Sequence, residues 1–135
     1  MAVKPYAGDA QRRQERQQNY DIAPTISERW PEVRSVAVDL RFARMERRTL
    51  PMPYRQIFLP PMRAFFAFLC PDPECRNGGF DLTPTIERGH ARHGGAIHGT
   101  LACGGQRPTR ERGWAACEIE LQFDVIFDDD PPASA

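Results

Sequence analysis

The chain has 135 residues, enough for one ordinary domain with tails, and its 41% hydrophobic content can build a modest core. Its 13 prolines and 10 glycines divide it into short pieces, which argues against a helical bundle and favours short strands joined by turns. The formal charge is zero, so the chain as a whole has no net attraction to nucleic acid or to an anionic membrane surface.

The first 32 residues are interpreted as a flexible arm followed by a short capping segment. Residues 9–19 are mostly good helix formers, but they have no apolar face to bury. Ile22, Ile26 and Trp30 are spaced by four residues and can cover the edge of a core. The sequence lacks the apolar stretch of a signal peptide or a membrane span, so we expect a soluble, cytoplasmic protein without a membrane partner.

Two strands are predicted in the next part of the chain. Large apolar residues alternate with small or charged ones over residues 33–43, which is typical of a strand with one buried face. Residues 49–61 contain four prolines, too many for a central strand, so we expect a loop there. Residues 63–70 are apolar on both faces and predict a second strand that is covered on each side.

A helix is predicted from Asp81 to about His93. Asp81 or Thr83 can cap its first turn, and the glycine pair at 94–95 ends it. Two further strands follow, over residues 96–103 and over residues 114–127, and the second of these is the clearest amphipathic strand in the sequence.

These elements predict an α+β domain over residues 33–128, with an antiparallel sheet of about four strands and one helix. Residues 129–135 are interpreted as an acidic, proline-containing tail.

The strongest chemical signal is a set of four cysteines. Cys70 and Cys75 enclose a turn with two prolines, Cys103 is followed by two glycines, and Cys117 begins an apolar strand face. Zinc prefers four such ligands in a tetrahedron. The pattern predicts a structural zinc ion, bound by all four thiolates at one end of the sheet.

Other uses of these residues stay open. The four thiols can instead form disulfides, take part in redox chemistry, or stay without a metal. His90 and His93 can join Cys70 and Cys75 in a site with two cysteines and two histidines. That set leaves the last two cysteines without a role, and only two residues separate the histidines, so we favour the four-cysteine site.

The segment from Cys70 to Cys117 resembles the broad zinc-ribbon group, in which turns at the ends of β-hairpins hold one zinc ion. The resemblance covers about fifty residues. It implies binding of nucleic acid or of a protein, the usual partners of such modules.

The loop from Gly104 to Gly113 is the candidate contact for nucleic acid. It carries Arg107, Arg110 and Arg112, which can bind phosphate groups, and Trp114 at its base can stack on a base. The alternative interpretation is a solvated turn whose tryptophan packs in the core.

Catalysis has little support in the sequence. Four thiolates close the coordination shell of zinc, whereas a catalytic zinc keeps one position open for water.

The aromatic run Phe65, Phe66 and Phe68 can stack bases, but we interpret it as core because the chain has few other large residues. We therefore expect a non-catalytic zinc-binding module that contacts nucleic acid, with a protein-interaction or assembly subunit as the alternative and a metal-dependent hydrolase as a minor one.

Overall fold

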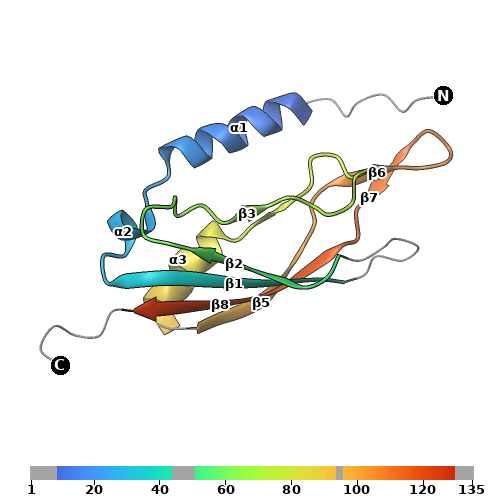
Figure 1. Cartoon of the computed structure of the whole chain (residues 1–135). Coiled ribbons are helices and arrows are strands. Elements are labelled where there is room, and N and C mark those ends of the chain that lie inside the picture. Colours follow the sequence, from blue (N-terminus) through green and yellow to red (C-terminus); the bar gives the residue numbers. More distant parts are fainter. Residues whose placement is uncertain (1–8, 44–50, 94–95, 130–135) are drawn as a thin grey trace, which may run out of the picture.

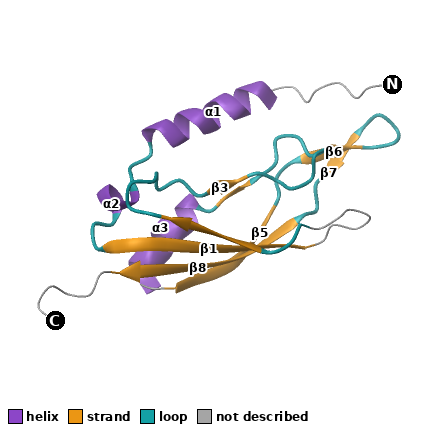
Figure 2. Ribbon diagram, viewed as in Figure 1, coloured by secondary structure: helices purple, strands orange, loops and turns teal. Residues whose placement is uncertain are grey.

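The computed structural model describes residues 9–43, 51–93 and 96–129, and within them a four-stranded antiparallel sheet forms the centre of the molecule (Figures 1 and 2). Its spatial order is β2-β1-β8-β5. The bounds of these strands are β1 Val33–Ala43, β2 Tyr54–Phe58, β5 Ala96–Ala102 and β8 Glu120–Asp129. The predicted fold class, an α+β domain with about four antiparallel strands, is confirmed.

Two small antiparallel ribbons and three helices complete the described fold. The ribbons pair β3 with β4 and β6 with β7, and α3 is the helix that the sequence predicts. The bounds are α1 Asp9–Ile22, α2 Ile26–Arg29, β3 Ala67–Phe68, β4 Phe80–Asp81, α3 Thr83–His93, β6 Gln106–Pro108 and β7 Trp114–Ala116. The glycine pair predicted to end α3 lies outside the described residues.

The core lies on one face of the sheet, because apolar side chains alternate along β1 and β8. Val38 and Val125 are paired across these strands and are both fully buried. Helix α3 covers this face through Leu82, at the turn before it, and Ile86. Gly89 lets the helix approach β5, since a Cβ there would lie 2.5 Å from Ile97 Cδ1.

The short helix α2 closes one edge of the core. Thr25 and Glu28 form a capping box, in which each side chain satisfies a backbone N–H of the other residue. Ile26 is fully buried and Trp30 packs edge-to-face on Phe127, whereas Ile22 is 80% exposed.

Helix α1 occupies the segment that the sequence analysis interprets as an arm. Figure 1 shows it lying along the outside of the β3 segment. Among the contacts of its described side chains, Arg16 Nη2 donates to the Ala67 carbonyl at 2.9 Å, and the Tyr20 ring meets Phe65 edge-to-face at 6.0 Å.

Three strand predictions need correction. The expected loop at 49–61 contains β2, which is possible because β2 is an edge strand and its prolines lie outside it. The expected strand at 63–70 is reduced to the two residues of β3, outside the main sheet. The expected strand at 114–127 is divided into β7 and β8, because residues 117–119 leave the ladder.

The helices among the described residues are all too short or too polar to cross a membrane.

Candidate metal centre and the adjoining hairpin

The side chains of Cys70, Cys75, Cys103 and Cys117 meet at one point. Their four Sγ atoms all lie within 4.8 Å of one another. The Cys70–Cys117 pair is separated by 3.7 Å and the Cys75–Cys103 pair by 3.6 Å. These distances are far above the bond length of a disulfide, about 2.05 Å, so the four thiols are free.

Two parts of the chain supply the cluster, and backbone hydrogen bonds join them. Cys70 and Cys75 lie on the turn after β3, while Cys103 follows β5 and Cys117 follows β7. Arg76 and Gln106 exchange backbone hydrogen bonds of 2.8 and 3.0 Å between these parts. This pairing brings sulfur atoms together that are up to 47 residues apart in sequence.

The backbone around Cys103 and Cys117 explains why the amphipathic pattern is interrupted. The N–H of Cys117 donates to the Gly105 carbonyl at 2.9 Å, and the N–H of Cys103 donates to the Ile119 carbonyl at 2.9 Å. Residues 117–119 therefore bond to the cysteine-bearing turn before β8 begins. This departure from the main sheet carries Cys117 to the other three thiols.

Two glycines provide the space for the sulfur atoms. A Cβ at Gly78 would lie 2.3 Å from Cys75 Sγ and 2.6 Å from Cys103 Sγ. A Cβ at Gly105 would lie 2.5 Å from Cys75 Sγ. Carbon and sulfur atoms in ordinary contact are more than about 3.5 Å apart, so only glycine fits at these two positions without a shift of the cluster.

The thiols perturb one another strongly. Hydrogen bonds from the thiols of Cys70 and Cys75 lower the pKa of Cys103, and the backbone N–H of Gly105 contributes, lying 3.4 Å from the sulfur. The same hydrogen bonds to Cys103 raise the pKa values of Cys70 and Cys75. Without a cation, these hydrogen bonds therefore favour the thiolate form of Cys103 and the protonated forms of Cys70 and Cys75.

The distances in the cluster match the size of a tetrahedral metal site. A zinc ion with four Zn–S bonds of about 2.3 Å has sulfur–sulfur edges of about 3.8 Å. The Cys75–Cys103 and Cys70–Cys117 separations, 3.6 and 3.7 Å, are close to this value. A divalent cation at the centre would also favour the thiolate form of every cysteine. The residues therefore fit a metal ion with soft sulfur ligands.

The histidine alternative finds no support in the described side chains. His90 packs between Trp30 and Phe127, with ring centroids 5.2 and 4.5 Å away. The groups that can hold a metal in the part of the chain that the structure describes consist of the four cysteines alone. The side chain of His93 lies outside the described residues.

The loop predicted to contact nucleic acid is the hairpin of β6 and β7, and its arginines differ in their surroundings. Arg107 forms ion pairs with Asp72 and, through Nη2 and Oε2 at 2.9 Å, with Glu74. Arg110 and Arg112 are exposed, and Trp114 is 36% exposed. Figure 1 shows that this hairpin extends beyond the end of the sheet.

Asp72 is a residue of the site that sequence reasoning missed. Its side chain is almost fully buried beside the cysteines, pairs with Arg107, and accepts a 3.0 Å hydrogen bond from the Glu74 N–H. Its position between Cys70 and Cys75 could have identified it in the sequence, because a carboxylate close to thiolates needs a nearby cation. The ion pair links the turn of the first two cysteines to β6.

Comparison with known proteins gives no relative for this chain: no family model, no curated protein sequence and no solved structure matches it.

Proposed function

We propose that the four cysteines hold one structural zinc ion in a zinc-ribbon-like site, and that the protein acts by binding rather than by catalysis. The observation that carries this proposal is the convergence of four Sγ atoms at separations close to those of a tetrahedral zinc site. Four thiolates leave no position for water, which supports a structural role. Free thiols also suit a reducing compartment, so the proposal includes a cytoplasmic location.

Nucleic acid is the partner that we propose first, with the tip of the β6–β7 hairpin as the contact. Arg110 and Arg112 are exposed there, and Arg112 has a left-handed backbone (φ 63°) in the turn. Thr109 stabilises this turn, because its Oγ1 accepts a 2.9 Å hydrogen bond from the Gly113 N–H. Trp114 at the base of the hairpin provides a partly exposed ring for stacking.

Arg107 has a structural role in this proposal. Its guanidinium is paired with the two acidic residues of the Cys70–Cys75 turn, so it connects the hairpin to the metal site. The variant that tests nucleic-acid binding therefore leaves Arg107 in place and replaces Arg110 and Arg112 by alanine.

Affinity for single- and double-stranded oligonucleotides across a salt series tests the hairpin. Loss of two phosphate contacts should weaken binding and reduce the slope of log affinity against log salt by about two units. Arg88→Ala, which removes one exposed arginine on α3, is the control for loss of positive charge outside the hairpin and should keep the wild-type slope. Equal salt slopes for wild type and the folded, zinc-loaded double variant would remove the hairpin from the proposal.

One observation favours the alternative, a protein-assembly subunit. The face of the sheet opposite the core carries an apolar row across all four strands, in which Ile57 pairs with Ala37, Ala37 with Ile126, and Ile126 with Ala96. Ile57 is 50% exposed and Ile126 is 47% exposed. Exposed apolar rows of this kind are typical of protein interfaces.

The assembly alternative differs from nucleic-acid binding in its response to salt. Association through the apolar row should survive high salt and should be lost in Ile57→Lys and Ile126→Lys. Light scattering and co-purification at low and high salt measure this. A monomer at all salt concentrations that retains no partner would refute the alternative.

A further inference from the structure

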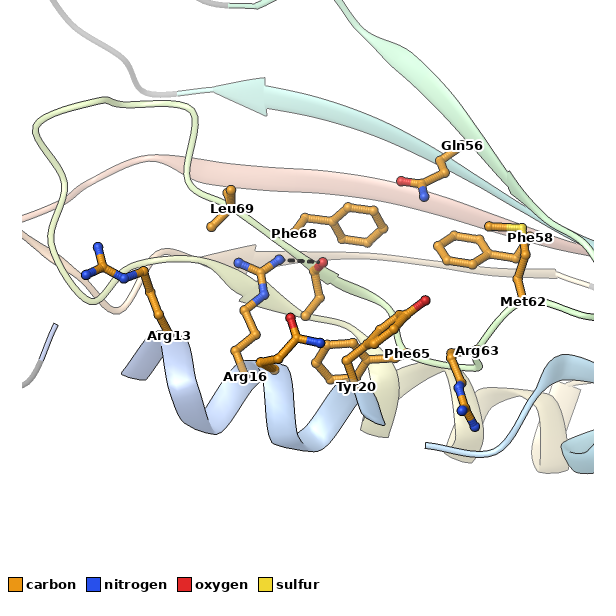
Figure 3. Close-up of a pocket in the computed structure, with 12 residues that line it drawn as sticks. Arg13, Arg16, Tyr20, Gln56, Phe58, Met62, Arg63, Phe65, Phe68 and Leu69 are labelled. Carbon is orange, nitrogen blue, oxygen red and sulfur yellow. Dashed lines mark hydrogen bonds between the residues drawn. The ribbon is translucent and has the colours of Figure 1, made fainter. Parts of the chain in front are cut away.

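A groove of about 550 Å³ lies between α1 and the body of the domain (Figure 3), and none of the four cysteines lines it. Its walls come from three parts of the chain: helix α1, strand β2, and the segment from Met62 to Leu69. Pockets that bind small molecules commonly have volumes of about 300–1,000 Å³. The groove is thus large enough for a mononucleotide.

The charged side chains of this groove are all basic. Arg13, Arg16 and Arg63 line it, and no acidic side chain is among the described residues that do. Arg16 points toward the centre in Figure 3 and uses Nη2 to hold the Ala67 carbonyl at 2.9 Å. A guanidinium has five N–H donors, so its other donors are available for an anion.

Aromatic rings form the apolar part of the groove. Tyr20 is 45% exposed, and its ring contacts the half-buried Phe65 edge-to-face. Of the three phenylalanines predicted to lie in the core, Phe66 and Phe68 do so, with exposed fractions of 0% and 7%, whereas Phe65 is outside it. The exposed face of Tyr20 therefore provides a stacking surface beside Arg16, supported by Phe65.

Two amide side chains add neutral polar groups to the same groove. Gln17 donates from Nε2 to Asp21 at 2.9 Å, which fixes its amide. Gln56 enters from β2 on the opposite side (Figure 3). Amides can donate to and accept from the edges of a nucleobase.

We infer that this groove binds a nucleotide, with its base stacked on Tyr20 and its phosphate held by Arg16. The combination of aromatic surface, amides and basic groups without acids matches a planar polar ring joined to an anion. The nucleotide can be a free mononucleotide or part of a single strand. This site does not depend on the proposed contact at the β6–β7 hairpin.

Calorimetric titration of the full, zinc-loaded protein with adenosine 5′-monophosphate, adenosine and a short single-stranded oligothymidylate tests the inference. The phosphate should strengthen binding relative to adenosine. An oligothymidylate that binds no tighter than the mononucleotide supports a free nucleotide as the ligand, and one that binds more tightly supports a strand. No binding of any nucleotide at millimolar concentration would overturn the inference.

Variants then locate the site. Tyr20→Ala should weaken binding by about five-fold or more, since stacking on an aromatic ring is worth about 1–3 kcal/mol per base. Tyr20→Phe retains the ring and should bind like the wild type, while Arg16→Gln should weaken the mononucleotide but not adenosine. Arg88→Gln is the matched control, and the hairpin double variant should keep its affinity for the mononucleotide.

Photo-crosslinking of the wild-type protein with 8-azidoadenosine monophosphate does not depend on how the variants fold. Crosslinked peptides from residues 9–22, 54–58 or 62–69, the three segments that line the groove, would support the site. Crosslinking only to other peptides, or unchanged affinity in a folded Tyr20→Ala variant, would overturn it.

Discussion

Replacement of Gly78 by alanine should damage the metal centre without removing a ligand. The added Cβ would lie 2.3 Å from Cys75 Sγ and 2.6 Å from Cys103 Sγ, roughly 1 Å inside the ordinary contact distance of about 3.5 Å. The sulfur atoms must move, and forcing an extra methyl group into packed surroundings typically costs about 1–3 kcal/mol. Zinc affinity should therefore fall by about five- to 150-fold.

Gly104→Ala provides a matched control. This glycine follows Cys103, but a Cβ there meets no heavy atom within 4 Å. Both variants add one methyl group beside the cluster and differ mainly in the space around it. Competition for zinc with a chromogenic chelator measures both affinities, and thermal unfolding of the zinc-loaded proteins measures both stabilities.

We expect a large loss of affinity and stability for Gly78→Ala and little change for Gly104→Ala. Wild-type zinc affinity in Gly78→Ala would refute it, because the sulfur atoms would then not need the space that this glycine leaves. Equal losses in both variants would refute it as well, since the effect would not follow from the packing.

Further predictions concern the ligands, the protons and the ion pair of the site. Cys117→Ser should abolish stoichiometric zinc binding and cooperative unfolding, because a structural site couples metal affinity to folding; metal analysis and circular dichroism measure this. Zinc binding at neutral pH should release at least the protons of Cys70 and Cys75, whose pKa values are raised in the metal-free cluster, and calorimetry in buffers of different ionisation enthalpy counts them. Arg107→Ala should lower the free energy of unfolding by about 1–3 kcal/mol, because it removes the cationic partner of the buried Asp72 carboxylate. The exposed Arg110→Ala should change it by less than about 0.5 kcal/mol, and equal effects in denaturant titrations would contradict this difference.

The strands that carry the core were predictable because their pattern has a local cause. In β1 and β8, alternate side chains point to opposite faces, so burial of one face appears directly in the sequence. Helix α3 was also predictable, because Asp81 Oδ1 accepts a 3.0 Å hydrogen bond from the Thr83 N–H at its start.

Two strand predictions were wrong because hydrogen bonds between distant parts of the chain override the local sequence pattern. The alternation from 114 to 127 reads as one strand, but the hydrogen bond from Cys117 to Gly105 keeps residues 117–119 with the cysteine turns. Strand β2 was missed because its prolines suggest a loop, although an edge strand tolerates prolines at its ends.

The four cysteines were predicted as one group, and the structure brings them together. Residue types and turn signals were sufficient for that, since thiols at turns are typical of metal ligands. The ion pairs of Arg107 were not predictable, because its partners Asp72 and Glu74 lie more than thirty residues away in sequence. Sequence alone made Arg107 equivalent to Arg110 and Arg112, and only the packing of the hairpin on the cysteine turn separates them.

X-ray absorption spectroscopy at the zinc edge, combined with metal analysis of the purified protein, tests the four-thiolate zinc site most directly. We predict about one zinc ion per chain and a first shell of four sulfur atoms at about 2.3 Å. A shell that contains nitrogen or oxygen ligands, or a folded protein without zinc whose stability does not respond to a chelator, would contradict the proposed site.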